Sequence, residues 1–348
     1  NLIPKFMHNH TTSIGQNYDV GDYETALDKA LAAADYKALR AEQAKRRASG
    51  DAKQLGIGVS VYVEITGGVG NGESAKVEVL EDGRAVVYTG TSPHGQGHDT
   101  AWSMLVQEQT GIPMDRIELV WGDTDLVPVG TGTMGSRSLQ QGGNAVFQVA
   151  GTLAEKAKSV AARLLEVSEA DVVLDKARGA FHVVGTPAVT KTWADLAVAE
   201  KSTGGLLHDE VINVSGATFP FGAHIAVVEV DTETGRVKHL RQVACDDAGK
   251  VLNPMLLDGQ IHGGIAQGVA QALLEEVLYD ADGNPTTSNL ADYGFISAAE
   301  LPNVEVIHME TPTPVNAIGA KGIGESGTIG STPAIQSAVV DAVSHLGV

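Results

Sequence analysis

An internal repeat is the feature that most constrains how this chain of 348 residues can fold. Four landmarks occur twice in the same order: a strand–turn–strand pattern, a Gly-Gln pair, a short apolar strand, and a Gly-Thr segment before an alanine-rich stretch. They occupy residues 75–88, 95–98, 117–120 and 132–136 in the first copy, and residues 226–240, 259–262, 304–307 and 327–331 in the second. Such a repeat indicates two copies of one hairpin, helix, strand and helix unit, and therefore an α+β fold.

Local patterns predict the elements of each copy. Gly83 and Gly235 are each followed by arginine and an apolar residue, as in a hairpin turn whose glycine supplies a positive φ. We expect each Gly-Gln pair to open a helix, the first at residues 98–110, and each Gly-Thr segment to precede one, the first at residues 142–167. Upstream, Asp22 is expected to cap a helix that reaches Leu39, and residues 55–63 alternate with period two like a strand.

The length of the chain predicts two domains and a short extra segment. We expect a partly helical connecting segment at residues 1–52, a first repeat at 53–190 and a second repeat at 191–348. The second copy is longer, because Gly83 and Gly95 are 12 residues apart whereas Gly235 and Gly259 are 24 apart. The second copy also has 8 more residues than the first between its short strand and its Gly-Thr segment. These additions fall around residues 246–254 and 321–325, which predicts that the second copy carries the chemistry.

Composition excludes several classes of function. A net charge of −19 disfavours a nucleic-acid partner, and the only local basic run is Lys45-Arg46-Arg47. Cys245 is the single cysteine, so the chain has no intrachain disulfide and no cysteine cluster for iron–sulfur or zinc. We find no apolar run of about eighteen residues and no leader pattern, which favours a cytoplasmic protein without a transmembrane segment. Because the chain begins at Asn1, we expect it to be a piece of a longer protein.

Two Gly-Thr-x-Gly-Ser segments are candidate anion sites, at residues 132–136 and 327–331. Just before a helix, unpaired amides and the positive end of the helix dipole attract an anion such as phosphate. Arg137 follows the first segment and can form forked hydrogen bonds with a phosphate. The same serine and threonine residues can also serve only as helix caps, and the sequence leaves both interpretations open.

Four further features need an interpretation. Gln96 lies on a tight Gly-Gln-Gly loop, where its amide can both donate and accept hydrogen bonds toward a ligand. His94 and His98 have no third ligand nearby, so we predict no zinc site. Residues 67–72 lack the ending of a phosphate loop and are expected to be a flexible hairpin. Glu325 stands between small residues in a glycine-rich turn, where it is either a general base or an ordinary solvated glutamate.

Six motifs in order resemble those of the molybdenum-binding subunit of the xanthine dehydrogenase and aldehyde oxidase family. They are Gly95-Gln96-Gly97-His98, Gly122-Asp123-Thr124-Asp125, Gly135-Ser136-Arg137-Ser138, Asn253-Pro254, Gly259-Gln260-Ile261-His262-Gly263-Gly264 and Lys321-Gly322-Ile323-Gly324-Glu325. The likeness covers nearly the whole chain. Residues 62–67 and 218–222 look most similar to the large subunit of aerobic carbon monoxide dehydrogenase and its relatives.

The resemblance implies duplicated molybdenum cofactor-binding domains and a specific chemistry. A molybdenum ion would be held by the dithiolene of a pterin (molybdopterin, including its cytosine dinucleotide form), with no protein side chain as an obligatory metal ligand. Glu325 falls on the family's general base, and Gln96 on the residue beside the metal's oxo group. The remaining residues implied to bind the cofactor are Gly95, Gly97, His98, Gly135, Ser136, Arg137, Ser138, Asp247, Asn253, Gln260, Lys321, Gly322, Ile323 and Gly324.

The resemblance also implies partners and a reaction class. Such an enzyme oxidises or hydroxylates an aldehyde, an N-heterocycle or carbon monoxide with water as the oxygen source. Electrons would pass to a [2Fe-2S] subunit and an FAD-binding subunit, in a dimer of heterotrimers. The sequence does not choose among these substrates. A non-catalytic pterin or nucleotide carrier, or a cofactor-insertion module, is the alternative function.

Two departures from the family pattern limit what this chain does by itself. The family's earlier half, with a Phe-Gly-Gly segment and a substrate-side loop, has no counterpart here, so we expect a C-terminal fragment that alone neither retains cofactor well nor turns over substrate. The motif Cys245-Asp246-Asp247 places its cysteine before the aspartates instead of after them. This order gives no support to a cofactor role for Cys245.

Overall fold

The computed structural model describes residues 7–68, 72–214 and 216–347 of the chain. Contacts divide the chain into two compact units. Unit 1 comprises Asn1–Thr66, Thr218–Thr313 and Ile323–Val348, and unit 2 comprises Gly67–Ala217 and Pro314–Gly322. Each unit has its own sheet and core, and each is described by itself.

Unit 2 contains the first copy of the repeat. Strands β4 (Glu73–Val79) and β5 (Ala85–Thr89) form the predicted hairpin, and Gly83 has the expected positive φ of 81°. Helix α3 (His98–Thr110) leads to β6 (Ile117–Val120), which pairs in parallel with β5. Helix α4 (Asn144–Leu165) follows, and strand β10 (Leu206–Ile212) completes the sheet order β10-β4-β5-β6.

A smaller layer completes unit 2. Strands β7 (Val172–Asp175), β8 (Ala180–Val183) and β9 (Thr186–Thr192) form a separate antiparallel sheet next to α5 (Trp193–Glu200). A capping box between Thr192 and Asp195 starts α5, so two otherwise unpaired amides of its first turn are satisfied. The Trp193 indole donates to the carbonyl oxygen of Thr110 at 3.0 Å and ties this helix to the end of α3.

Unit 1 contains the second copy. Strands β11 (Phe221–Asp231) and β12 (Val237–Asp247) form a hairpin around Gly235, whose φ is 71°. Helix α6 (Pro254–Leu273) leads to β13 (Val304–Met309), which pairs in parallel with β12, and α7 (Ser326–Val343) follows. The two units therefore share one topology, and the predicted duplicated α+β fold is confirmed.

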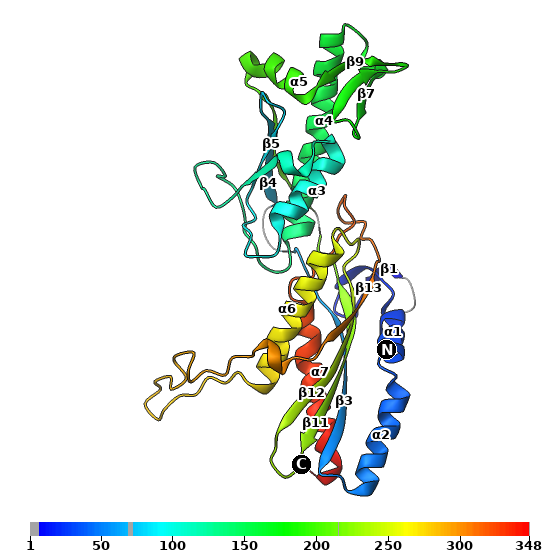
Figure 1. The fold of residues 1–348 in the computed structure, drawn as a ribbon, viewed down its shortest axis with the longest axis vertical. Coiled ribbons are helices and arrows are strands. Elements are labelled where there is room, and N and C mark those ends of the chain that lie inside the picture. The colour runs from blue at the N-terminus through cyan, green and yellow to red at the C-terminus, as the bar shows by residue number, and fades with distance from the viewer. Residues whose placement is uncertain (1–6, 69–71, 215, 348) are drawn as a thin grey trace. The chain divides into compact units, whose positions relative to one another are not determined.

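Helices cover both faces of the unit 1 sheet (Figure 1). Ala226, Val228 and Ala244 face the core formed with α6 and α7. Ile225 and Val243 face the opposite core, formed with α1 (Tyr23–Ala33). Because neither face of β11 meets water, the strand is apolar along nearly its whole length instead of alternating. A short hairpin, β1 (Met7–Thr11) with β2 (Asn17–Gly21), precedes α1.

The compact units do not follow the order of the chain. Strand β3 (Lys53–Val63) precedes the first hairpin in sequence, yet it pairs with β11 of the second copy along its whole length, giving the order β13-β12-β11-β3. Conversely, β10 precedes the second hairpin and pairs with β4 of the first copy. By chain order, the predicted ranges 53–190 and 191–348 assign β3 to the first copy and β10 to the second. In the structure their assignment is set by long-range backbone pairing.

One predicted helix end and two predicted helix starts differ from the structure. The helix capped by Asp22, whose carboxylate accepts from the Thr25 amide, ends at Ala33 because Asp35 adopts a left-handed φ of 49°. A second helix, α2 (Tyr36–Ser49), continues to Gly50. Asn253 caps α6 ahead of Pro254, so the Gly-Gln segment at 259–262 lies inside that helix and does not open it. The second Gly-Thr segment likewise lies within α7 and not before it.

The remaining local predictions agree with the structure except at the start of α4. Helix α4 begins two residues later than predicted, after a π-helical turn at Ser138–Gly143. Of the predicted flexible hairpin at 67–72, residues 69–71 lie outside the described residues. Within the described part of the chain, no helix combines the length and apolarity needed to cross a membrane.

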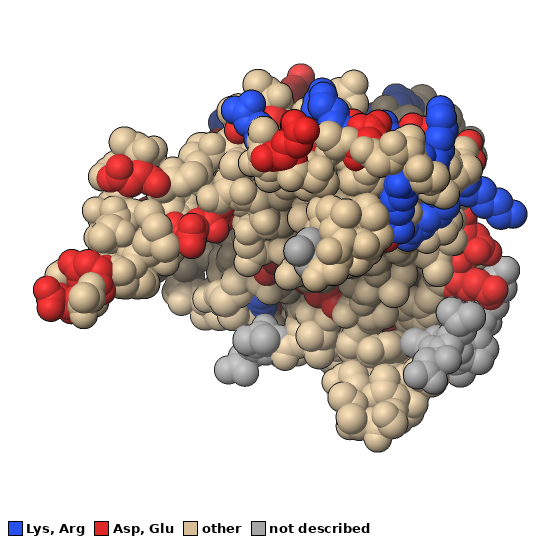
Figure 2. Space-filling model, turned by 90° about the horizontal axis from the view of Figure 1, so that it is seen from below, with Lys and Arg blue, Asp and Glu red and all other residues tan. Residues whose placement is uncertain are grey.

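The basic run on α2 is paired with acidic neighbours. Arg46 contacts Glu229 at 2.8 Å and Glu42 at 3.0 Å, and Arg47 lies 3.6 Å from Asp341. On the face drawn in Figure 2, basic and acidic side chains accordingly lie beside one another. This local pairing agrees with the expectation that the run is not a nucleic-acid contact.

Candidate functional site

The Gln96 loop of unit 2 holds its amide in a defined orientation. Gly95 and Gly97 have φ values of 100° and 82°, which a side chain at either position would strain. The Gln96 Oε1 atom accepts from the backbone amide of His94, and Nε2 lies 3.0 Å from Nε2 of His98 and 3.5 Å from the carbonyl oxygen of Ser92. No atom lies within 4 Å of the position that a Cβ at Gly95 would take, so the loop backbone is open on that side.

His98 fixes which way this amide faces. Its Nδ1 atom lies 3.1 Å from the carbonyl oxygen of Thr91, which can only accept, so Nδ1 carries the proton and Nε2 accepts from Gln96. Burial lowers the pKa of His98 and outweighs the hydrogen bond to Thr91, so the ring stays neutral near pH 7. The ring also stacks on Trp102 at 4.4 Å between centroids. His98 is thus a support for Gln96 and not a metal ligand in this arrangement.

Arg137 is committed to a buried ion pair. Its guanidinium is 1% exposed and bonds the carboxylate of Glu73, the carbonyl oxygen of Gly132 at 2.9 Å and that of Gly72 at 3.4 Å. The forked contact predicted with a phosphate is therefore made with groups of the protein itself. The Arg137–Glu73 ion pair fixes the loop that precedes the π-helical turn. A ligand of this loop would therefore be contacted by atoms of residues 132–138 other than the Arg137 guanidinium.

The Gly-Ser-Arg-Ser loop packs directly on the segment that contains Lys321 and Gly322. A Cβ at Gly322 would lie 1.8 Å from the carbonyl oxygen of Ser136, so only glycine permits this approach of two backbones. Ser136 has a positive φ of 51°, which is uncommon for a residue with a side chain. Lys321 is 1% exposed. The structure thereby brings together two segments that lie about 185 residues apart and that the resemblance assigns to one function.

Unit 1 places three of the expected residues around the start of α6. Asp247 ends β12 in full burial, and its Oδ1 atom accepts from the Gly249 amide at 3.0 Å. Asn253 caps α6 by accepting from the Leu256 amide at 3.2 Å. Gln260 lies on the helix itself, half-buried. The 12 added residues of the second copy mainly lengthen the strand, which has 11 residues in β12 against 5 in β5, and add the first turn of α6 ahead of Gly259.

The glycines of the second copy pack two helices together. A Cβ at Gly268 of α6 would lie 2.0 Å from the Ser331 Oγ atom of α7, and a Cβ at Gly264 would lie 3.0 Å from the Cα atom of Gly327. The Thr328 hydroxyl donates to the carbonyl oxygen of Gly264 at 2.9 Å. The second candidate anion segment, residues 327–331, thus lies in the first turns of α7 and not before the helix, and its residues contact α6.

Glu325 is the N-cap residue of α7. Its carbonyl oxygen accepts from the amides of Thr328 and Ile329, both at 3.0 Å, and its side chain is exposed. Ile323 packs against the unit 1 core on one side, and Ser326 is fully buried on the other. Glu325 is therefore an exposed carboxylate on a fixed backbone, beside the positive end of a helix of 18 residues.

A family model now settles what kind of domain this is. The model of the molybdopterin cofactor-binding domain matches residues 29–302. The chain belongs to the molybdopterin cofactor-binding domain family.

Full-length relatives of this molybdopterin-binding chain are subunits of larger enzymes. The carbon monoxide dehydrogenase large chain of Hydrogenophaga pseudoflava is 40% identical over all of this chain and 45% of the relative. The nicotine 6-hydroxylase large subunit of Paenarthrobacter nicotinovorans is 33% identical over 97% of this chain and 43% of the relative. The chain thus spans less than half the length of these relatives.

Solved structures show the same fold. A Cu,Mo-CO dehydrogenase in its carbon monoxide reduced state superposes with a TM-score of 0.89 at 36% identity, over 97% of this chain and 45% of that one. Quinoline 2-oxidoreductase from Pseudomonas putida 86 gives a TM-score of 0.88 at 33% identity, over 98% of this chain and 45% of that one.

The described residues fit a pterin cofactor in their donor set and backbone shape. Gly95 and Gly135 combine a positive φ with open space where a side chain would stand, so a ligand can approach the peptide groups closely. Backbone amides of these loops are donors that suit the oxygen atoms of a pterin and its phosphates. Among the residues that the structure describes, no group of three or more His, Cys, Asp or Glu side chains could hold a metal ion.

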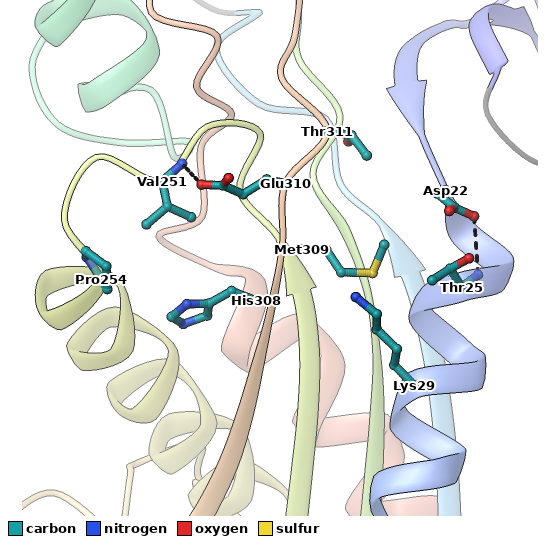
Figure 3. A pocket seen from close by; sticks show the side chains of 9 residues that line it. All are labelled: Asp22, Thr25, Lys29, Val251, Pro254, His308, Met309, Glu310 and Thr311. Carbon is teal, nitrogen blue, oxygen red and sulfur yellow. Dashed lines mark hydrogen bonds between the residues drawn. The ribbon is translucent and has the colours of Figure 1, made fainter.

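A hollow of about 490 Å³ lies on unit 1, lined in part by Val251 and by Pro254, the residue after Asn253 (Figure 3). Asp22, Thr25 and Lys29 line one side, and His308 lies on the other next to residues 309–311. Glu310 accepts from the Val251 amide at 2.9 Å. None of the residues predicted to bind the cofactor lines this hollow.

Sequence reasoning missed a buried polar cluster beside the start of α7. His224 on β11, Asp246 on β12 and Tyr62 on β3 meet in the interior of unit 1. The available signal was His224 itself, a polar residue in the otherwise apolar run of residues 219–228. Such a residue inside a buried strand requires a partner from elsewhere in the chain.

Proposed function

We propose that this chain is the molybdenum cofactor-binding part of an oxidoreductase that hydroxylates or oxidises a small substrate with oxygen from water. The observation that carries the proposal is Glu325, an exposed carboxylate held on the first turn of α7, in a chain of the molybdopterin cofactor-binding family. The names of the relatives, which oxidise carbon monoxide or hydroxylate nicotine, support this class of reaction.

The residues of the chain have separate proposed roles. Glu325 is the general base that takes a proton as an oxygen derived from water attacks the substrate carbon. Gln96 lies beside the cofactor, with its amide held in orientation by His98 and the His94 amide. When bound, the molybdenum–pterin supplies the site that accepts the electrons of the substrate.

Holding the cofactor is assigned to two groups of residues. In unit 2 these are the backbone of residues 95–98 and 135–138 with Lys321 and Gly322. In unit 1 they are Asp247, Asn253 and Gln260 with residues 323–324. Arg137 contributes by fixing its loop through Glu73. The cytosine dinucleotide form of molybdopterin is the proposed cofactor, on the strength of the resemblance to carbon monoxide dehydrogenase.

Partner subunits are also part of the proposal. The relatives include a gamma subunit of a 6-hydroxypseudooxynicotine dehydrogenase complex, which supports a multi-subunit enzyme. FAD-binding and [2Fe-2S] subunits, arranged as a dimer of heterotrimers, are proposed as the electron acceptors. A cytoplasmic location stays a prediction. The chain alone is expected to retain the cofactor poorly, and stoichiometric molybdenum on the isolated chain, measured by plasma mass spectrometry, would contradict this.

Replacement of Glu325 by glutamine in the complete enzyme tests the reaction. We expect turnover to fall by about 10²–10⁴-fold, because an amide cannot accept the proton, while molybdenum content is unchanged. The matched control is Glu233→Gln, at the exposed turn between β11 and β12, which should retain wild-type turnover. Unchanged turnover in Glu325→Gln would refute the role of the base. A wild-type protein that binds cofactor without oxidising carbon monoxide, benzaldehyde or quinoline would favour the carrier function.

A further inference from the structure

The buried cluster of Tyr62, His224 and Asp246, called here the Asp246 cluster, has no role in the reaction as described so far. The Tyr62 hydroxyl donates to Asp246 Oδ1 at 2.6 Å, and His224 Nε2 lies 3.0 and 3.1 Å from the two carboxylate oxygens. His224 is 0% exposed, Asp246 is 1% exposed and Tyr62 is 9% exposed. A carboxylate so deeply buried is tolerated only with such donors.

Two glycines make room for the Asp246 cluster. A Cβ at Gly222 of β11 would lie 2.2 Å from Asp246 Oδ1 and 2.7 Å from the Tyr62 ring. A Cβ at Gly330 of α7 would lie 2.6 Å from the His224 ring. The imidazole is thus pressed against the backbone of α7, one turn after Ser326, the first residue of that helix. The cluster is built into the contact between the sheet and α7.

Ser326 connects the Asp246 cluster to the start of α7. Its single hydroxyl proton is donated either to Glu64 Oε2, 3.1 Å away, or to the Tyr62 oxygen, because the proton of Tyr62 itself goes to Asp246. Burial and the charge of Asp246 raise the pKa of Tyr62, so the phenol stays protonated and keeps donating to Asp246. Ser326 is 0% exposed, whereas its neighbour Glu325 is exposed. The backbone of Glu325 is therefore fixed through the buried side chain that follows it.

We propose that the Asp246 cluster is a set of positioning residues that hold Ser326, and through it set the direction in which Glu325 leaves the first turn of α7. The inference rests on the proposed function of Glu325 as the base. A shift of about 1 Å in a reacting group can cost about 100-fold in rate. The Tyr62 hydroxyl, which acts on Glu325 through Ser326, therefore has a measurable effect on turnover.

The test compares Tyr62→Phe, Ser326→Ala and the double variant in the complete enzyme with its partner subunits. Activity is followed by dye reduction with carbon monoxide, benzaldehyde or quinoline, whichever the wild-type enzyme oxidises. We expect each single variant to lose about 10-fold in kcat with KM and molybdenum content unchanged. The double variant should also lose about 10-fold and not about 100-fold, because both changes cut the same connection.

Amide hydrogen exchange supplies a readout that does not depend on activity. In both single variants the first turn of α7, at residues 326–330, should exchange faster, because the amides bonded to the Glu325 carbonyl lose their support. The matched control is Asp341→Asn, which removes a hydrogen-bonded carboxylate from the last turns of the same helix. It should speed exchange there and leave kcat at the wild-type value.

Three results would overturn the inference. The first is a kcat within twofold of wild type in both single variants. The second is a loss of about 100-fold in the double variant, which would show two independent roles. The third is unaltered exchange at residues 326–330. Failure of the proposed function is distinct, since it would appear as full activity of Glu325→Gln, whereas failure of this inference leaves that variant inactive.

Discussion

Two alanine substitutions on α6 measure how tightly this helix packs against α7. Gly268 is buried, and a Cβ there would lie 2.0 Å from Ser331 Oγ and 3.0 Å from the carbonyl oxygen of Thr328. Gly263 lies on the same helix, and nothing stands within 4 Å of its Cβ position. Both changes gain the same helix propensity of about 1 kcal/mol, so the difference between the two variants isolates packing.

The expected difference follows from these distances. An ordinary carbon contact needs about 3.5 Å, so Gly268→Ala must push α7 away or turn Ser331 out of its place, at a cost of about 1–3 kcal/mol. For a unit of this size each kcal/mol shifts the melting temperature by about 2–4 °C, so Gly268→Ala should melt about 2–12 °C below Gly263→Ala.

Thermal unfolding followed by circular dichroism gives the comparison directly. Gly263→Ala should melt at or above the wild-type temperature, because it only removes the backbone entropy of a glycine in a helix. Equal melting temperatures for the two variants would refute the close helix contact. If Gly263→Ala were less stable than Gly268→Ala, the face of α6 that carries Gly263 would be the one packed against the protein.

Three further predictions concern buried or paired groups. Glu73→Gln leaves the buried Arg137 charge uncompensated and should lower the free energy of unfolding by about 3–5 kcal/mol, measured by urea denaturation; a loss under 1 kcal/mol would contradict the pairing. Burial raises the pKa of Cys245 to about 12, so its thiol should resist a disulfide reagent at pH 8 and react fully in urea, whereas rapid labelling of the folded chain would disprove its burial. Burial opposes the charge of Asp341, but hydrogen bonds from Ile57 and Gln43 together with Arg40 outweigh it and lower its pKa. Because the folded pKa lies below the unfolded one, this stabilisation is present at neutral pH and is lost as pH falls through the folded pKa. Asp341→Asn should therefore flatten the acid side of the curve of unfolding free energy against pH. An unchanged curve would contradict the lowered pKa of Asp341.

The sequence by itself determined the local elements of the two copies. Gly83 and Gly235 mark turns that need a positive φ, and the strands on either side form hairpins in the structure. Helix α3 begins and ends at the predicted residues, since glycine lies at both of its ends. These features depend on residues close in sequence, so their patterns predict them directly. The family motifs predicted Glu325 and Gln96 for the same reason, because each motif is a short continuous segment.

Only the tertiary structure decided which strands pair and which polar groups meet. Strand β3 pairs with β11, over 150 residues later in the chain. The sequence does not predict this pairing, because backbone groups can pair with any strand in suitable register and the hydrophobic pattern does not specify which strand that is. The same holds for the Asp246 cluster, whose tyrosine lies 162 residues before His224. The first turns of α7 pack against α6, so a pattern of glycines that suggested a loop became a helix contact. Burial and long-range pairing are properties of the folded chain, and no local pattern contains them.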